Sequence, residues 1–302
     1  MNKKKSSAFA RQSAGDRVLL IIAYTILGLF LVAIIFPIIY IILSSFIDPI
    51  TLQNKGVTFD FSKWTLMAYE RVLGNAQIWV GFKNALLYSI EATILGGVIT
   101  LLAAYPMSRP DFRGRGFFNV IFVITMFFGG GLIPTYLLMV RLGFMNTFWV
   151  YIIPSLFSAY YMLLTSSYIQ GLPEALFESA RIDGAGEITI FGKIVLPLST
   201  PMLACIALYA GVGHWNSWFD VSLYSKNGTW DNLQIILYRL INQANALEKL
   251  MESQTSDVAL RNIRPETMRA ATTVVVVLPI VMVYPFLQKY FVSGITLGAV
   301  KG

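Results

Sequence analysis

Cysteine, histidine and charged residues are all scarce in this 302-residue chain. Cys205 is the only cysteine, so no disulfide can form within the chain, and we expect it to pack as a small apolar side chain. His214 is the only histidine, so a histidine-rich metal site or a Cys-His nucleophile is excluded and no metal is expected. Charged residues make up 13% and hydrophobic residues 56%, whereas soluble proteins carry roughly 25% charged residues. These proportions predict a polytopic membrane protein.

The motifs of nucleotide hydrolysis and covalent catalysis are also missing. A phosphate-binding loop needs the spacing Gly-x-x-x-x-Gly-Lys-Ser/Thr. The nearest segment, Gly186 to Lys193, has one residue too many between its glycines, and Ile194 stands where the hydroxyl is needed. No Gly-x-Ser-x-Gly nucleophile elbow occurs either. We therefore expect no enzyme activity and no cofactor in this chain.

Long uncharged stretches supply about six membrane spans. At 1.5 Å per residue, about 20 apolar residues cross roughly 30 Å of hydrocarbon. The expected spans are residues 18–46, 85–107, 117–140, 148–172, 194–219 and 270–287. The fold class is thus an all-α integral membrane protein, in which residues 18–291 form one transmembrane domain between a segment 1–17 and a tail 292–302.

Basic residues set the expected orientation in the cell membrane. Lysine and arginine divide almost evenly between the two sides, but those of segment 1–17 and those around Arg113 lie close to span ends in short segments. That is where the positive-inside rule applies. We therefore expect both termini in the cytoplasm, and we attribute the net charge of +7 to topology and not to binding of nucleic acid.

Glycine and proline are expected to break two of the spans. Gly129-Gly130-Gly131 and Pro134 interrupt the third span, and Pro154 falls in the fourth. The freed backbone groups must be satisfied by neighbouring helices. Irregular backbone at that depth should therefore face protein or a water-filled cavity.

One polar island, residues 173–197, lies between two apolar stretches. It reads Glu178-Ser179-Ala180-Arg181-Ile182-Asp183-Gly184, then nine residues, then Ile194-Val195-Leu196-Pro197. A polar helix in such a chain has no lipid to face and must meet another protein. The pattern resembles the Glu-Ala-Ala loop of the membrane-spanning subunits of binding-protein-dependent ABC importers, with Ser179 in place of the usual alanine.

The resemblance implies a short cytoplasmic coupling helix that docks into a cleft of an ATPase subunit. Its candidate docking residues are Glu178, Ser179, Ala180, Asp183, Gly184, Leu196 and Pro197. Two other segments resemble the same family, Ala103 to Arg115 and the tail from Gln288 to Gly302, and the tail is similar to that of maltose-permease-type carbohydrate importers. Such a permease subunit is expected to pair with a second homologous permease. Its other partners would be two ATPase subunits, which hold ATP and Mg, and an extracellular binding protein that delivers an oligosaccharide.

Aromatic and amide residues near the expected outer surface are candidates for the substrate path. They are Trp215, Asn216 and Trp218 at the end of the fifth span, with Tyr160 and Tyr161 in the fourth. Aromatic rings stack on the C–H faces of sugars, but an aromatic belt at the membrane interface explains the same residues equally well.

The longest hydrophilic segment, residues 220–269, is expected outside. It contains an Asn227-Gly228 turn signal and a helix-compatible stretch from Leu233 to Met251. It is the candidate contact for the binding protein, through Asn227, Gly228, Asn245 and Glu252.

Glu91 keeps a second class of function open. It is the only acid within the expected spans, where a charge costs about 2.5–3.5 kcal/mol on insertion scales. A proton-coupled secondary transporter would use it as a relay, although no second acid or inverted repeat accompanies it. A membrane-embedded glycan-processing enzyme would need paired acids or metal ligands, and neither occurs at usable spacing. The ATP-driven importer is therefore the expected function, and the sequence does not identify the sugar.

Overall fold

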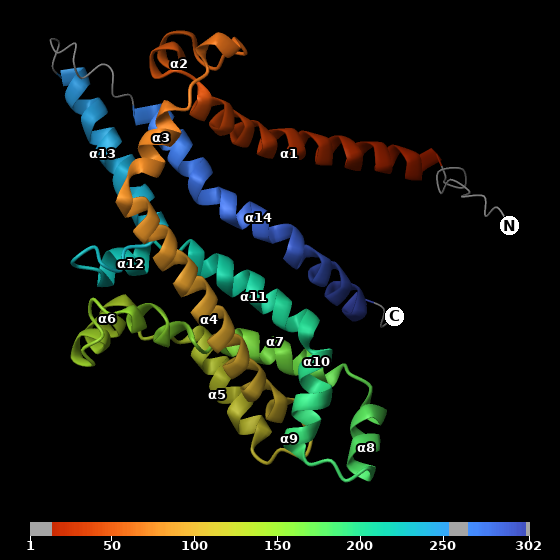
Figure 1. Ribbon diagram of the computed structural model, residues 1–302. Helices are drawn as coiled ribbons and strands as arrows, with labels where there is room; N and C mark the ends of the chain where they lie inside the picture. The colour runs from red at the N-terminus through yellow and green to blue at the C-terminus, as the bar shows by residue number, and fades with distance from the viewer. Residues whose placement is uncertain (1–13, 254–264, 300–302) are drawn as a thin grey trace. The chain divides into compact units, whose positions relative to one another are not determined.

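The computed structural model describes residues 14–253 and 265–299 (Figure 1). Over these ranges every regular element is helical, apart from an isolated antiparallel bridge between Ile47 and Trp64. The expected all-α fold is confirmed. The chain divides into two compact units, unit 1 (Met1–Val72 and Ala244–Val274) and unit 2 (Leu73–Gln243 and Val275–Gly302).

Unit 1 begins with a long apolar helix whose side chains are almost all exposed. It comprises α1 (Ala14–Phe46), α2 (Pro49–Lys55), η2 (Phe61–Lys63) and most of α3 (Met67–Gly74), with parts of α13 (Leu233–Ser253) and α14 (Pro265–Ala299). None of the most apolar window of α1 is buried, as expected of a helix that faces lipid or another subunit. Where α1 ends, the Ser45 and Tyr69 hydroxyls share a hydrogen bond of 2.6 Å, which holds α3 close to that end.

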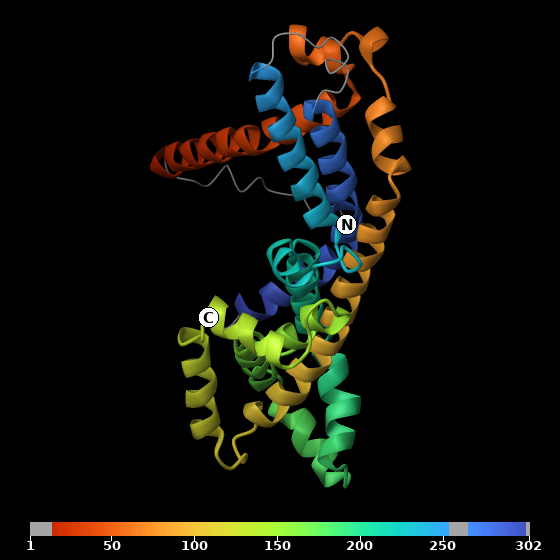
Figure 2. The same cartoon turned by 90° about the vertical axis from the view of Figure 1, so that its left-hand side faces the viewer.

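Unit 2 is built around α4, which packs against α7 and α11 (Figure 1). The turn between α4 and α5 lies beside the α8–α9 segment, at the lower end of the ribbon in both Figure 1 and Figure 2. Besides parts of α13 and α14, the unit contains α4 (Ala76–Ser108), α5 (Arg115–Phe127), α6 (Leu132–Arg141), η3 (Phe148–Tyr151), η4 (Ile153–Ser155), α7 (Ala159–Gln170), α8 (Glu174–Ile182), α9 (Glu187–Ile190), η5 (Phe191–Val195), α10 (Leu196–Leu198), α11 (Thr200–Trp215) and α12 (Phe219–Tyr224).

The six expected spans are present as three single helices and three bent pairs. Gly15–Phe46, Ala76–Ser108 and Glu266–Phe286 are each long and apolar enough to cross a membrane. The pairs bend by 106° between α5 and α6, by 47° between η3–η4 and α7, and by 67° between α9–α10 and α11. Counting each pair as one span gives six. The helix expected from 233 to 251 also forms, as α13, while α14 continues as a helix to Ala299 through most of the expected tail.

Each bend has a local backbone cause. Gly131, with a φ of +85°, separates α5 from α6, and Pro154 lies in η4 just before the break that precedes α7. Both breaks were expected from the sequence. The third was not. It falls at Ser199, between α10 and α11, and Pro201 in the first turn of α11 has no N–H to continue the hydrogen bonding of the preceding helix.

A glycine lets α4 approach the start of α13 closely. A Cβ built on Gly81 would lie 3.1 Å from the Asn232 carbonyl carbon and also 3.1 Å from the Leu233 nitrogen, and it would overlap the Ile236 side chain. We expect Gly81→Ala to lower the free energy of unfolding by about 1–3 kcal/mol through overpacking. Thermal unfolding of the purified protein, followed by tryptophan fluorescence, would measure the loss.

Gly97→Ala is the matched control in the same helix, because a Cβ there meets no atom within 4 Å. It should be neutral or stabilise by up to about 1 kcal/mol. Equal midpoints for the two variants would contradict the close approach.

Candidate functional site

The polar island folds into α8, a tight turn and α9. Gly184 has a φ of +78°, which favours glycine, and its N–H donates to the Arg181 carbonyl at 3.0 Å. The Ala185 N–H donates to the Ala180 carbonyl at 2.9 Å. These two bonds form a Schellman motif, which satisfies the carbonyls at the end of α8. The glycine of the recognised pattern thus ends the helix.

α8 presents a polar face outward and an apolar face inward. Glu178, Ser179, Asp183 and Gly184 are exposed, as expected of docking residues. Phe177 is 1% exposed and belongs to a core shared with the ends of α4 and α7. Ala180 and Ala185 pack against this same core. Ala180 is half-buried and helps to attach α8 to the rest of unit 2, and its contribution to the docking surface remains a prediction.

Two isoleucines beside the turn are exposed although they lie outside the apolar spans. Ile182 is 86% exposed and Ile188 is 88% exposed. Sequence analysis missed both, and their place in a polar segment was the available signal. Large exposed apolar side chains in a polar segment are typical of a protein contact.

Arg109 joins α8 to the end of α4. It follows the last residue of α4 and is 8% exposed. Its guanidinium carbon lies 3.5 Å from the centroid of the Phe177 ring and 5.2 Å from that of Tyr105. One guanidinium nitrogen, Nη1, lies 3.6 Å from Oε2 of Glu174. Arg109 belongs to the segment from Ala103 to Arg115 that resembles the importer family, but its stacking on Phe177 was not expected from the sequence.

The buried stack outweighs the ion pairs around it. The Arg181 guanidinium lies 4.0 Å from Glu174 and 3.4 Å from Glu187, and all three side chains are more than a third exposed. Such exposed pairs contribute about 0–1 kcal/mol each. A desolvated cation–π contact contributes about 2 kcal/mol, and burial of a phenylalanine about 1.5–3 kcal/mol. The position of α8 therefore depends mainly on Phe177 and Arg109.

Leu196 and Pro197 lie apart from α8. They form part of α10, where the chain bends into α11, and both are exposed. They were expected to belong to the ATPase-coupling residues. The structure places them just before the bend, and a direct contact with the ATPase remains a prediction.

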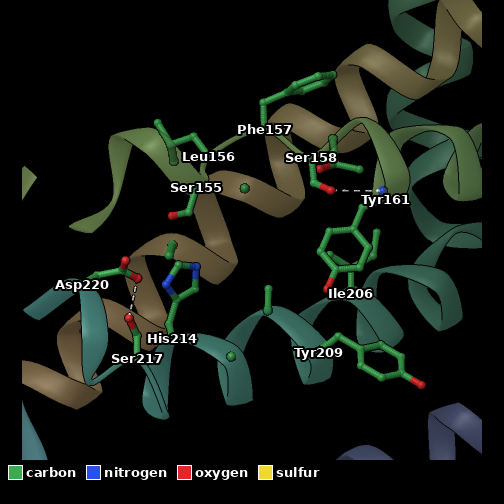
Figure 3. A pocket seen from close by; sticks show the side chains of 15 residues that line it. Ser155, Leu156, Phe157, Ser158, Tyr161, Ile206, Tyr209, His214, Ser217 and Asp220 are labelled. Atoms are coloured by element: carbon green, nitrogen blue, oxygen red, sulfur yellow. Dashed lines mark hydrogen bonds between the residues drawn. The ribbon is translucent and has the colours of Figure 1, made fainter. Parts of the chain in front are cut away.

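A cavity of about 370 Å³ opens between α4, η4, α7, α11 and α12 (Figure 3). Small residues of α4 line one wall. Tyr161 and Tyr209 lie at one end, and His214, Ser217 and Asp220 lie at the other. The Ser217 hydroxyl donates to an Asp220 carboxylate oxygen at 2.7 Å. Aromatic rings and hydroxyl groups around a cavity of this size suit a small polar ligand.

Of the residues expected along the substrate path, Tyr161 lines this cavity. Tyr160 is 55% exposed and does not line the cavity. Trp215 is 5% exposed, its indole N–H donates to the Val276 carbonyl at 3.2 Å, and its ring packs edge-on against Phe82. This ring packs helices together and also lines a separate, mainly apolar cavity between α4, α11 and α14. A place for Trp215 on the substrate path remains a prediction.

Asn216 and Trp218 connect the end of α11 to α13. The Asn216 side-chain oxygen accepts a hydrogen bond from Gln234 at 3.0 Å. Trp218 stacks on Tyr238 with ring centroids 4.6 Å apart. Neither residue lines the cavity, and their place on the substrate path remains a prediction.

The turn after α12 is fixed to α4. Asn227 is exposed, and Gly228 adopts a φ of +73°, as the turn signal indicated. The Asn84 side-chain amide donates to the carbonyls of Thr229 and Asp231, at 3.0 and 2.8 Å, and the Tyr88 hydroxyl donates to the Trp230 carbonyl at 2.7 Å. Sequence analysis had not singled out these polar residues of α4. Their hydrogen bonds hold the segment that follows the Asn227-Gly228 turn against α4.

Two other residues expected to contact the binding protein lie further along α13. Asn245 is half-buried. The backbone of Glu252 is helical, but its side chain lies outside the described residues. Their proposed contact with the binding protein remains a prediction.

Glu91 lies half-buried in α4. Within the described part of the chain, no hydrogen bond or ion pair connects its carboxylate to another residue. A proton relay needs a series of such partners, so the structure provides no support for one.

Comparisons with known proteins agree on one family. The model of the family described as "Binding-protein-dependent transport system inner membrane component" matches residues 93–297. The polygalacturonan/rhamnogalacturonan transport system permease protein YtcP of Bacillus subtilis is 32% identical over 95% of this chain and 99% of its own length. Protein LplC of the same species is 35% identical over 89% of this chain and 90% of its own.

A solved structure also has this fold. It is a chain of a bacterial ABC transporter involved in the import of the acidic polysaccharide alginate. The two chains superpose with a TM-score of 0.82 at 28% identity, covering 93% of this chain and 99% of that one.

The buried stack generates a prediction about α8. Arg109→Ala should lower the protection of α8 amides by about 2 kcal/mol, because the cation–π contact with Phe177 is lost. Arg109→Lys should recover only part, since an ammonium lacks the planar guanidinium. Hydrogen exchange of the peptide covering residues 174–182 would measure both.

Arg181→Ala is the matched control, because its side chain is 39% exposed. It should change protection by less than about 1 kcal/mol. An effect of Arg181→Ala as large as that of Arg109→Ala would contradict the dominance of the buried stack.

Proposed function

Because the chain belongs to the family of binding-protein-dependent transport system inner membrane components, we propose that it forms one half of the pore of an ATP-driven oligosaccharide importer. The family recognised from the coupling motif is thereby confirmed. A second homologous permease supplies the other half, two ATPase subunits bind the cytoplasmic side, and a binding protein delivers the sugar.

The observation that carries this proposal is the outward face of α8. Exposed Glu178 and Asp183 lie close in sequence to exposed Ile182, in a short polar segment between apolar spans. The carboxylates of this face are unfavourable in lipid, and its isoleucine is unfavourable in water. A cleft in a soluble protein can accommodate both. α8 is therefore the coupling helix. Through it, the movement of the ATPase subunits as they close on ATP is transmitted to the membrane spans. The chain itself needs no cofactor, since ATP and Mg belong to the ATPase subunits.

The orientation follows from the same contacts. Arg109 connects α8 to the basic α4–α5 turn, which carries Arg113 and Arg115. Basic turns of this kind lie on the cytoplasmic side. The α8 region therefore shares the cytoplasm with the N-terminus, and the Asn227-Gly228 turn faces outward, where the binding protein docks.

The sugar substrate is supported by the relatives and by the cavity. YtcP is named for polygalacturonan and rhamnogalacturonan, and the solved transporter for alginate. The cavity offers this chain's own hydroxyl groups and rings, from Tyr161, Tyr209 and Ser217, to such a ligand. ATP binding then shifts the population between inward-open and outward-open states, because the ATPase dimer binds ATP more tightly in one of them.

The docking surface can be tested by removing one charge or one apolar contact. Glu178→Lys and Ile182→Ser should each weaken co-purification with the ATPase subunits by about tenfold or more, the first because it reverses a charge that selects the partner and the second because it removes apolar area. Both side chains are exposed, so the permease should still fold.

Glu70→Lys makes the same charge change at an exposed position of α3 and should leave co-purification unchanged. If Glu178→Lys and Ile182→Ser also leave it unchanged, the assignment of α8 as the coupling helix is wrong.

The topology can be tested by cysteine labelling in a Cys205→Ala background. An impermeant maleimide added to intact cells should label Asn227→Cys but not Ile188→Cys, and permeabilised cells should show labelling at both. Both positions are exposed. Labelling of Ile188→Cys but not of Asn227→Cys in intact cells would invert the orientation.

A further inference from the structure

We propose that the cavity beside Asp220 accepts neutral sugar units and disfavours uronates, the carboxylated sugars. The inference rests on the proposed function, because it specifies which oligosaccharides pass along this subunit. The cavity is the one between α4, η4, α7, α11 and α12, about 370 Å³ in volume (Figure 3).

The charge of the lining carries the argument. Asp220 is the only carboxylate among the fifteen described residues that line the cavity, and none of the fifteen is a lysine or an arginine. Apart from the imidazole of His214, the lining has no group that becomes positive. Proteins recognise carboxylates with arginine or lysine, which pair with both oxygens or neutralise the charge. A uronate here would find no such partner and would meet a like charge.

The remaining polar groups match uncharged hydroxyls. The Tyr161 hydroxyl can both donate and accept a hydrogen bond. The Ser155 and Ser217 hydroxyls already donate, to the Ile152 carbonyl and to Asp220, so they present oxygens that accept from a sugar hydroxyl. Asp220 adds an acceptor that already receives the Ser217 hydroxyl at 2.7 Å, so a sugar hydroxyl could donate to its other oxygen. The two tyrosine rings supply apolar faces. This set suits a neutral pyranose and lacks what an acidic one needs.

The inference separates this chain from the named relatives. The solved transporter imports an acidic polysaccharide, and YtcP is named for polygalacturonan, a polymer of a sugar acid. Similarity across the fold does not fix the charge in one cavity, because specificity depends on the few side chains that line it.

The local charge can be measured directly in the assembled transporter. Ser155 lines the cavity and is exposed, so Ser155→Cys in a Cys205→Ala background places a reactive thiol there. Its reaction rates are compared for two methanethiosulfonates of similar size, one with a trimethylammonium group and one with a sulfonate. Each rate is divided by the rate at which the same reagent reacts with a small thiol in solution, which corrects for the intrinsic reactivity of the reagent. The measurements are made at about pH 8, where an imidazole is neutral.

We expect the cationic reagent to react at least about fivefold faster than the anionic one after this correction. Asp220→Asn keeps the shape and should bring the ratio close to one. Asp60→Asn removes the same charge from unit 1, outside the cavity, and should leave the ratio unchanged. An anionic reagent that reacts as fast as the cationic one, or a ratio that survives Asp220→Asn, would overturn the proposal.

A second measurement tests the sugar itself. Galactose should slow labelling of Ser155→Cys by an uncharged methanethiosulfonate at a concentration at least about fivefold lower than galacturonate does. Equal or stronger protection by galacturonate, or protection by neither sugar, would overturn the assignment of the cavity. Neither result would affect ATPase docking at α8, so failure here is distinguishable from failure of the importer assignment.

Discussion

All three candidate sites of unit 2 depend on one helix, α4. Its 33 residues extend roughly 50 Å at 1.5 Å per residue. Near its start, Asn84 and Tyr88 hold the turn that follows α12. Gly96 lines the cavity in its middle, and Arg109 stacks on the coupling helix at its end. Pro106 lies between the cavity wall and Arg109 and has no N–H, so α4 lacks one hydrogen bond of its ladder there. A displacement of α8 would reach the cavity wall through this one helix, with Pro106 as the position where it bends most easily. Coupling through a packed element of this kind needs no separate chain of side chains between the two sites.

The breaks in the other spans complement this helix. Backbone that leaves helical geometry inside a membrane must be satisfied by protein or water. The break after Pro154 fulfils this condition, because Ser155 and Ser158 at that break line the cavity. Ser158 also accepts a hydrogen bond from the Tyr161 N–H and so caps α7. The break therefore does two things: it restarts the helix, and it supplies hydroxyl groups at a depth where an intact apolar helix would present none.

The sequence predicted what depends on local pattern and missed what depends on packing. Apolar runs located the spans, and Gly129–Gly131 and Pro154 located two of the three bends, because these residues act on their own backbone. The coupling pattern located α8 for the same reason, since Gly184 ends the helix through its own φ. Burial is set by contacts distant in sequence. The burial of Trp215 and the packing of Ala180 against the core therefore did not follow from the sequence. The family-like segment contained Arg109 but gave no sign that its guanidinium stacks on Phe177.

The exposed apolar surface of this chain has two different costs. The side chains of α1 are exposed in a region where lipid is the solvent, so their exposure costs little. Ile182 and Ile188 project from a polar segment that meets water, where burying each would stabilise by about 1.5–3 kcal/mol. Together they could supply about 3–6 kcal/mol to docking, which is comparable to the cost of ordering two proteins against each other. Docking driven by two isoleucines alone would thus be weak and reversible. The neighbouring carboxylates of Glu178 and Asp183 then select the partner more than they strengthen the complex, because exposed charges act mainly on specificity and on the rate of encounter.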